Sequence, residues 1–251
     1  NTETLTRYRY CTHDNLEYIL RRLKSARVFN QAKFSMKLRF LYRAYRARYR
    51  DQRHEIFAAR AALRPGDTAA DIGAHKGAYL YRLKRAIGKS GEVHAFEPQS
   101  PLAAYLQNIT NTMNWKNVFV HECALTDRVG TSLLHVPGKD DSPSASLGDH
   151  VNQNGPNHSY ECVVDTLDSK LQSSKQVGFL KVDVEGFELQ VFRGAEQILE
   201  QHAPVILFEC ETRHLTEHTM TDVFAFLLDR GYTGSFFAPD GLRPVEEFNA
   251  E

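Results

Sequence analysis

The chain has 251 residues, of which 42% are hydrophobic and 25% are charged, and its formal net charge is zero. This composition is typical of a globular domain and excludes a disordered or fibrous chain. No apolar run approaches the roughly 18 residues of a membrane-spanning helix. Four scattered cysteines without a C-x-x-C pair favour free thiols in a reducing compartment, so the cytoplasm is the predicted location.

Residues 1–62 are predicted to form a basic helical arm. Residues 1–64 carry a net charge of +11 and the remainder −11. Two apolar stripes have helical spacing: Leu16, Ile19, Leu20 and Leu23, then Phe34, Leu38, Leu41, Tyr45 and Tyr49. The arm either packs on the domain through these stripes or meets an anionic surface (nucleic acid, membrane or glycan) or a second subunit. Arg64-Pro65-Gly66-Asp67 marks its end.

Strands and helices alternate through the predicted domain, residues 63–251. The expected strands are 67–70, 92–96, 117–125, 177–184, 204–210 and an edge strand at 232–237. The expected helices are 78–87, one capped by Ser100, 188–201, and one from Thr221 or Asp222 to Gly231. Repeated βα units predict an α/β fold with a mainly parallel sheet and helices on both faces. The unbroken apolar run 205–208 predicts a strand buried on both faces. Residues 130–165 are predicted to be an insertion with a hairpin.

A glycine turn, residues 71–77, joins the first strand to the first helix of this domain. Gly73 and Gly77 permit backbone conformations that other residues avoid. A dinucleotide fingerprint reads G-x-G-x-x-G, but here the carboxylate of Asp71 opens the turn. An acid there would repel a pyrophosphate and suits a ligand with positive charge, such as S-adenosylmethionine. The missing first glycine disfavours an NAD-dependent oxidoreductase.

Further acids end the next strands, where ligands of open α/β sheets bind. Glu97 follows Asp71 by 26 positions, close to the usual offset of an acid that accepts from ribose hydroxyls. Cys123 and Ala124 either flank an adenine or belong to the core.

Lys181, Asp183 and Glu185 share one side of an extended strand because side chains alternate. Buried charges are costly unless they are paired or functional. Lys181, Asp183 and Glu185 therefore form either a structural ion pair or part of a catalytic site. A Mg²⁺ site with Glu209 is the rival use of the acids, but no ligand-spacing motif supports a metal.

Five ordered motifs resemble those of the FkbM-type methyltransferases. They are Asp71-x-Gly73-Ala74-x-x-Gly77, Phe96-Glu97-Pro98, Ala124-Leu125-Thr126-Asp127, Thr166-Leu167-Asp168 and Lys181-x-Asp183-x-Glu185-Gly186-x-Glu188. The resemblance covers about residues 63–232 and excludes the arm. It implies a class I (Rossmann-like) fold with a seven-stranded sheet and S-adenosylmethionine-dependent O-methylation, with sugar and macrolide hydroxyls among the family's substrates.

The resemblance also implies site residues. The expected cofactor contacts are Asp71, Gly73, Ala74, Gly77, Glu97, Pro98, Cys123, Ala124 and Asp183. Asp183 and Glu185 are expected to face the reaction centre. The family commonly has Asn where this chain has His75, which departs from the pattern at a cofactor contact.

Methyl transfer to a hydroxyl needs a base that removes the proton as the new bond forms. Asp183 is the first candidate for this base or for orienting the acceptor. Glu185, Glu209 and His75 are the alternatives. His75 either titrates near neutrality or serves only as a backbone partner beside the glycine turn. The predicted function is O-methylation of a sugar, glycan or related small molecule. The alternatives are a nucleic-acid methyltransferase that uses the arm and a non-catalytic S-adenosylmethionine-binding module.

Overall fold

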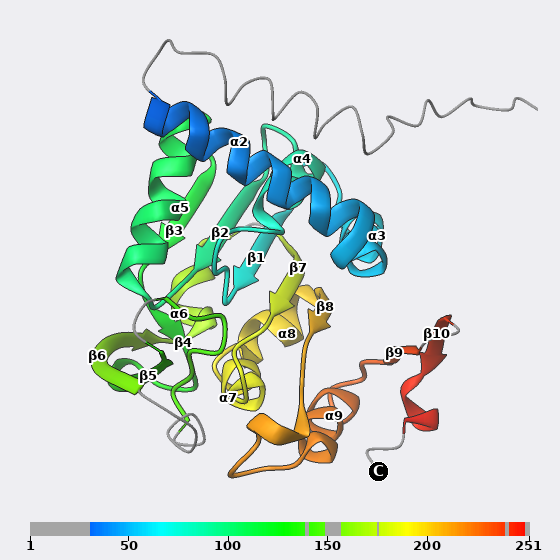
Figure 1. The fold of residues 1–251 in the computed structure, drawn as a ribbon. Coiled ribbons are helices and arrows are strands. Elements are labelled where there is room, and N and C mark those ends of the chain that lie inside the picture. Colours follow the sequence, from blue (N-terminus) through cyan, green and yellow to red (C-terminus); the bar gives the residue numbers. More distant parts are fainter. Residues whose placement is uncertain (1–30, 139–140, 149–156, 175, 239–240, 249–251) are drawn as a thin grey trace, which may run out of the picture. The chain divides into compact units, whose positions relative to one another are not determined.

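The computed structural model describes residues 31–138, 141–148, 157–174, 176–238 and 241–248 (Figure 1). The chain divides into residues 1–36 and a compact unit, residues 37–251. Of the first unit only the beginning of α2 is described, so the stripe from Leu16 to Leu23 lies outside the described residues. The predicted arm residues 37–62 belong to the compact unit.

Helices and strands alternate along the unit. The helices are α2 (Gln31–Arg46), η1 (Ala47–Asp51), α3 (Arg53–Ala62), α4 (Leu80–Ile87), α5 (Ser100–Thr112), α6 (Leu167–Leu171), α7 (Glu188–Arg193), α8 (Glu196–His202), η3 (Thr212–His214), α9 (Met220–Leu228) and η4 (Val245–Glu247). The strands are β1 (Thr68–Ile72), β2 (Glu92–Phe96), β3 (Val118–His121), β4 (Ala124–Leu125), β5 (Gly130–Pro137), β6 (Asn157–Asp165), β7 (Val177–Val182), β8 (Val205–Phe208), β9 (Ser235–Ala238) and β10 (Gly241–Pro244).

A parallel five-stranded sheet in the order β3-β2-β1-β7-β8 forms the centre (Figure 1). The helices α3, α4 and α5 contact its strands on one side. On the other side, Ala70, Ile72, Leu180 and Val182 join a buried apolar core with residues of α6 to α9. The strand order reverses between β1 and β7, and such a switch point is where open α/β sheets bind ligands.

The α/β fold with a parallel sheet and helices on both faces is therefore confirmed, but the sheet has five strands in the described residues rather than seven. β9 does not join its edge, because it pairs antiparallel with β10. β8 is the last strand on its side and is only partly buried; Val205 is half exposed, so the predicted burial on both faces is wrong.

The predicted insertion, residues 130–165, contains two paired strands. β5 and β6 pair antiparallel, and β4 adds to β6 in parallel. The predicted strand 117–125 is split, because Glu122 and Cys123 separate β3 from β4. The sequence could not show this break, since it arises where the chain leaves the main sheet for the smaller one.

The predicted helix 188–201 is broken at Gly194. A Cβ there would lie 2.0 Å from the carbonyl oxygen of Thr126, so only glycine allows this approach. The Asp168 carboxylate accepts from Gln197 and Ile198 N–H, both at 3.0 Å, and caps α8.

Two helix starts also differ from those predicted. Gln99 rather than Ser100 is the N-cap of α5, and Ser100 Oγ donates to Glu122 Oε1. α9 begins after Thr219, which forms a capping box with Asp222.

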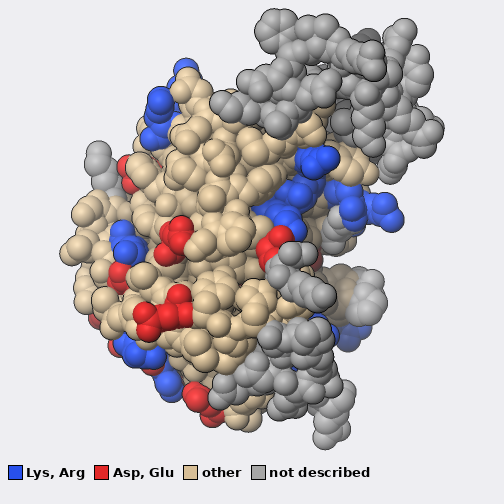
Figure 2. All heavy atoms as spheres, turned by 60° about the vertical axis from the view of Figure 1, so that its left-hand side comes forward, with Lys and Arg blue, Asp and Glu red and all other residues tan. Residues whose placement is uncertain are grey.

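The apolar stripe of α2 differs from the predicted one. Phe40, Ala44 and Ala47 are the buried residues, whereas Tyr49 is 59% exposed. Phe40 packs edge-on against Tyr81 and Trp115. The arginines lie against rings, with Arg82 near the faces of Tyr49 and Tyr81. Figure 2 shows a group of basic side chains on the face it presents, with acidic ones scattered singly. No described helix has the length and apolarity to cross a membrane.

Candidate active site

A cavity of about 260 Å³ opens at the carboxyl ends of β1, β2 and β7. Its apolar wall includes Phe96, Cys123, Ala124, Leu125 and Leu134. Its polar wall includes His75, Glu97, Gln99, Asp183, Glu185 and Glu209. The cavity therefore has an apolar side that suits a flat ring and an acidic side that suits a cation.

The glycine turn is tied to the neighbouring strand ends. The backbone N–H groups of Gly73 and Ala74 both donate to the carbonyl oxygen of Phe96 at the end of β2. Gly73 has a φ of 72°, and a Cβ there would lie 1.8 Å from the carbonyl oxygen of Asp183. Glycine is needed because the turns after β1 and β7 touch at this point.

Glu97 forms the buried centre of the β2 side of the cavity. Its carboxylate accepts from His75 N–H at 2.7 Å and from Gln99 N–H at 3.0 Å. Burial raises the pKa of Glu97 to about 6, although both hydrogen bonds favour the charged form. Each oxygen keeps a lone pair for a further donor such as a ribose hydroxyl.

Asp71 has a different environment from the one its sequence position suggested. It is 1% exposed and pairs in register with Lys181 of β7, on the sheet face that α3 and α4 cover. Neither of its carboxylate oxygens accepts a hydrogen bond from a described residue, and Lys181 Nζ lies 3.8 Å from Oδ1. Burial raises the pKa of Asp71 against the pull of Lys181.

Lys181 connects the two central strand ends. Its Nζ donates to Gly73 O and to Asp183 Oδ2, both at 3.0 Å. Burial opposes the charge of Lys181, but Asp183 and Asp71 raise its pKa above the ordinary value. The structural ion pair left open by the sequence therefore exists, and Asp183 belongs to it while also lining the cavity.

Glu185 and Glu209 complete the acidic wall. Glu185 has a φ of 53°, and burial with the nearby carboxylates Asp183 and Glu209 raises its pKa to about 7. Burial and the Asp183 charge also raise the pKa of Glu209. Among the residues described, no group of three or more His, Cys, Asp or Glu could hold a metal ion.

His75 lines the cavity with a left-handed backbone, φ 46°. Asn and His both tolerate this conformation better than most residues. Burial and the charge of Lys76 lower the pKa of His75 to about 4, so the expected titration near neutrality is wrong. At pH 7 its imidazole is neutral.

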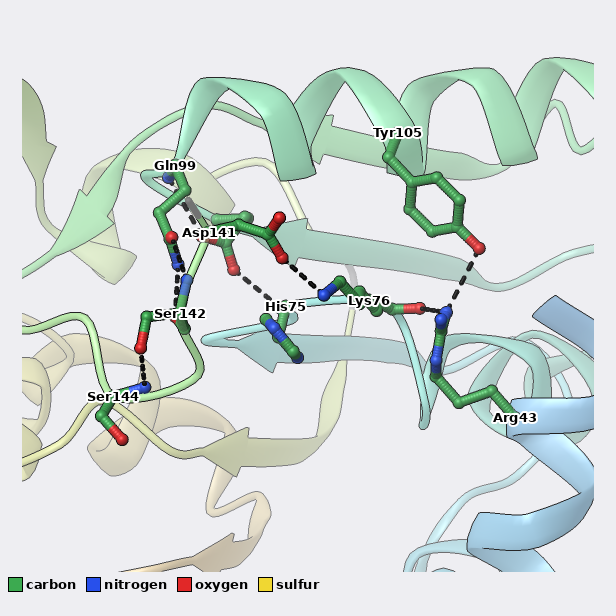
Figure 3. A network of polar contacts seen from close by, with 9 residues as sticks. Arg43, His75, Lys76, Gln99, Tyr105, Asp141, Ser142 and Ser144 are labelled. Carbon is green, nitrogen blue, oxygen red and sulfur yellow. Dashed lines mark hydrogen bonds and ion pairs between the residues drawn. The ribbon is translucent and has the colours of Figure 1, made fainter. Parts of the chain in front are cut away.

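Residues 141–148 form a strap beside the cavity, and Pro143, Ala145, Ser146 and Leu147 line it. Gln99 binds the strap twice: its Nε2 donates to Ser142 O at 2.9 Å, and its Oε1 accepts from Ser142 N at 3.0 Å. Lys76 Nζ lies 2.5 Å from Asp141, and Arg43 donates to Lys76 O and Tyr105 (Figure 3). The strap is thus fixed to α5 and to the glycine turn.

Most predicted site residues meet in one place. Those that line the cavity are Gly73, His75, Glu97, Pro98, Cys123, Ala124, Asp183, Glu185 and Glu209. Asp71, Ala74 and Gly77 do not. Glycine is favoured at position 77 by packing, because a Cβ there would lie 2.9 Å from Leu106 and 3.2 Å from Phe40. Gln99 and Ser146 were missed; only the Pro98-Gln99-Ser100 helix start pointed to Gln99.

Known proteins share the sequence pattern of this region. Residues 71–233 match the methyltransferase FkbM domain. This match covers well over half of the chain. The chain belongs to the FkbM methyltransferase family. No match was found among the curated proteins.

Solved structures of methyltransferases resemble the fold of this FkbM-family chain. A methyltransferase FkbM from Methylobacillus flagellatus KT is 18% identical, with 80% of this chain and 50% of that chain covered and a TM-score of 0.48. This chain thus spans half the length of that protein. A SAM-dependent methyltransferase from Aquifex aeolicus is 16% identical, with 78% and 88% covered and a TM-score of 0.45. Fibrillarin from Aeropyrum pernix, with S-adenosyl-L-methionine bound, is 15% identical, with 72% and 66% covered and a TM-score of 0.41.

S-adenosylmethionine is the cofactor of this family. The residues of the cavity fit it on two grounds. Glu97 offers a buried carboxylate with acceptor capacity, as a ribose needs. Burial and, after it, the charge of Asp183 raise the pKa values of Glu185 and Glu209, and a cationic ligand beside these acids would favour their charged forms.

Proposed function

We propose that this FkbM-family chain transfers a methyl group to a hydroxyl of a sugar, glycan or related small molecule. The observation that carries the proposal is that Glu97 lines the same cavity as an acidic wall, which consists of Asp183, Glu185 and Glu209. S-adenosylmethionine, when bound, supplies a methyl group on a positively charged sulfur. Glu97 would hold the ribose and the acidic wall would attract the charged end. Gly73, Pro98, Cys123 and Ala124 would border the cofactor.

The acidic wall would also activate the acceptor. A hydroxyl is a weak nucleophile until a base takes its proton. Asp183 is engaged by Lys181 at 3.0 Å, which favours an orienting role. Glu185 has no lysine or arginine ion pair among the described contacts, and its pKa of about 7 suits a base at neutral pH. The neutral His75 would contact the cofactor or the acceptor rather than carry charge.

The test is a screen with methyl-labelled S-adenosylmethionine against sugars, glycans and small hydroxyl compounds. We expect label to become alkali-stable, ether-bound methyl on one acceptor class, with Glu185→Gln reducing the rate about 100-fold or more. Ser173→Ala, a change at an exposed position in the loop between α6 and the start of β7, serves as the unchanged control. Label in nitrogen-bound methyl only, or none with any hydroxyl compound, would contradict the proposal.

A nucleic-acid methyltransferase is the second candidate, and a specific observation favours it. Residues 37–64 contain nine Lys or Arg and two Asp or Glu. Arg48 and Arg82 lie near the face of the half-exposed Tyr49, and such pairs can stack with bases. Gel shifts with DNA and RNA at increasing salt decide between the two, because phosphate binding weakens steeply with salt. The same basic surface is also the proposed contact for a membrane, a glycan or a second subunit.

We also propose a reducing, cytoplasmic location. The described cysteines, Cys123, Cys162 and Cys210, are free thiols and at least partly buried. Burial raises the pKa of each to about 11 or 12, so none is activated as a thiolate. Structural thiols of this kind persist in a reducing compartment.

A further inference from the structure

We propose that His214 is a positioning residue that holds the Glu185 carboxylate in the cavity, and that its Nδ1 donates a hydrogen bond to Oε2 after a small turn of the ring brings the N–H into line. The inference rests on the proposed function, in which Glu185 is the base. His214 belongs to η3, after β8, and no sequence motif pointed to it. Its Nδ1 lies 2.7 Å from Glu185 Oε2, and both side chains are largely buried, 14% and 17% exposed.

The backbone at Glu185 is held in an unusual conformation. Glu185 has a φ of 53° and Gly186 a φ of 101°. A non-glycine residue in the left-handed region is strained, and surrounding contacts must maintain this conformation. One contact comes from the strap, where Ser146 Oγ donates to the Glu185 carbonyl oxygen at 2.8 Å.

The second contact comes from η3 itself. A Cβ on Gly186 would lie 2.3 Å from the carbonyl oxygen of His214, so the backbones of the two segments touch. The N–H of His214 donates to Glu211 O at 2.9 Å, which fixes the turn. The imidazole therefore reaches Glu185 from a rigid, closely packed support. This arrangement brings one side chain next to one carboxylate oxygen.

The charges around the pair define its protonation. Glu185 faces Asp183 after β7, Glu209 and Glu211 after β8, and Arg213 of η3; burial followed by these carboxylates raises its pKa. His214 faces Arg213, Glu211 and Asp183, and burial and Arg213 lower its pKa. At pH 8 the imidazole is neutral and Glu185 is a carboxylate. A neutral imidazole with its proton on Nδ1 stabilises that carboxylate.

The proton balance of the step is simple. As the acceptor oxygen forms its bond to the methyl carbon, the carbon–sulfur bond breaks and the sulfur keeps the electron pair. The acceptor's proton passes to Glu185, which becomes a neutral acid. His214 keeps its own proton throughout and turns its ring only as far as the new acid requires. It acts through Glu185 and does not touch the reacting atoms.

The test is a ¹³C NMR titration of the Glu185 carboxyl carbon in the intact chain, with the signal identified by its loss in Glu185→Gln. His214→Phe keeps a ring but removes the donor. A hydrogen bond to a charged group contributes about 1.5 kcal/mol or more, so we expect the titration midpoint to rise by about one pH unit. His214→Asn places an amide N–H near the position of Nδ1, and we expect it to restore the midpoint.

His218→Asn is the matched control. His218 is on the same segment and half-buried, and its charged neighbours are Asp222, Arg193 and Glu217 rather than the cavity acids. An unchanged midpoint in His214→Phe, or an equal shift in His218→Asn, overturns the inference. If His214→Phe does not fold, ¹⁵N spectra of the unchanged chain decide: a proton on Nδ1 supports the inference and a proton on Nε2 alone overturns it.

Failure of the inference can be told apart from failure of the proposed function. Calorimetry with S-adenosylmethionine is run on the same samples. Loss of the proposed function appears as absent cofactor binding in the unchanged chain. If the inference fails, cofactor binding is intact and the titration midpoint of Glu185 is the same in the unchanged chain and in His214→Phe.

Discussion

Replacing Gly73 by alanine tests whether the turns after β1 and β7 touch as described. The new methyl carbon would lie 1.8 Å from the Asp183 carbonyl oxygen, so one backbone must move. Alanine in the left-handed region costs about 1–2 kcal/mol, and overpacking adds about 1–3 kcal/mol. We therefore expect Gly73→Ala to lower the free energy of unfolding by about 3 kcal/mol. For a chain of this size, this lowers Tm by roughly 6–12 °C.

Gly231→Ala separates the two contributions. Gly231 has a φ of 82°, close to the 72° of Gly73, and nothing lies within 4 Å of its added Cβ. Only the backbone cost of about 1–2 kcal/mol applies, so we expect Tm to fall by about 2–8 °C. Differential scanning calorimetry of both variants gives the comparison. If the two melt within about 2 °C of each other, the turns do not approach closely and the reasoning about this part of the site is refuted.

Three further substitutions follow from the buried polar groups. Lys181→Met leaves the buried Asp71 carboxylate and the partly exposed Asp183 carboxylate without their lysine and is expected to cost about 3–5 kcal/mol in urea unfolding. A large part should be regained in the Lys181→Met/Asp71→Asn double variant, and additive effects of the two substitutions would contradict the pairing. Glu188 is 1% exposed and burial raises its pKa to about 7, so its contribution to stability is full below pH 4.5 and is lost as pH rises through 7. Glu188→Gln should therefore remove on the order of 3 kcal/mol of that pH dependence, and an unchanged pH profile refutes the assignment. Gln99→Ala removes both hydrogen bonds to Ser142 and should increase hydrogen exchange in the strap at least 10-fold, whereas unchanged exchange shows that the strap is held by other contacts.

The acids at the strand ends could be predicted because each one stands at or directly after the end of its strand in the sequence. Glu97, Asp183 and Glu185 lie at the cavity, as their positions after β2 and β7 indicated. The parallel pairing of β1, β2 and β7 followed from the repeated βα units. These features depend on alternation and on short-range turn chemistry.

Contacts between distant segments could not be predicted. Asp71 faces the helices rather than the cavity because its register opposite Lys181 places both on the buried sheet face. Ser142 lies 43 positions from Gln99, and Ser146 lies 39 from Glu185. The α2 stripe was misplaced because Phe40, rather than the larger tyrosines, packs against Tyr81 and Trp115, and Ala44 is buried with it. Only packing decides such choices.

Calorimetry with S-adenosylmethionine tests the central claim most directly. The account predicts one binding site on the intact chain, lost or weakened at least 100-fold in Glu97→Ala, because the ribose acceptor and the anchor of the glycine turn disappear together. Glu92→Ala, at the opposite end of the same strand β2, should bind as the unchanged chain does. Absence of binding by the unchanged chain, or equal binding by Glu97→Ala, would contradict the account.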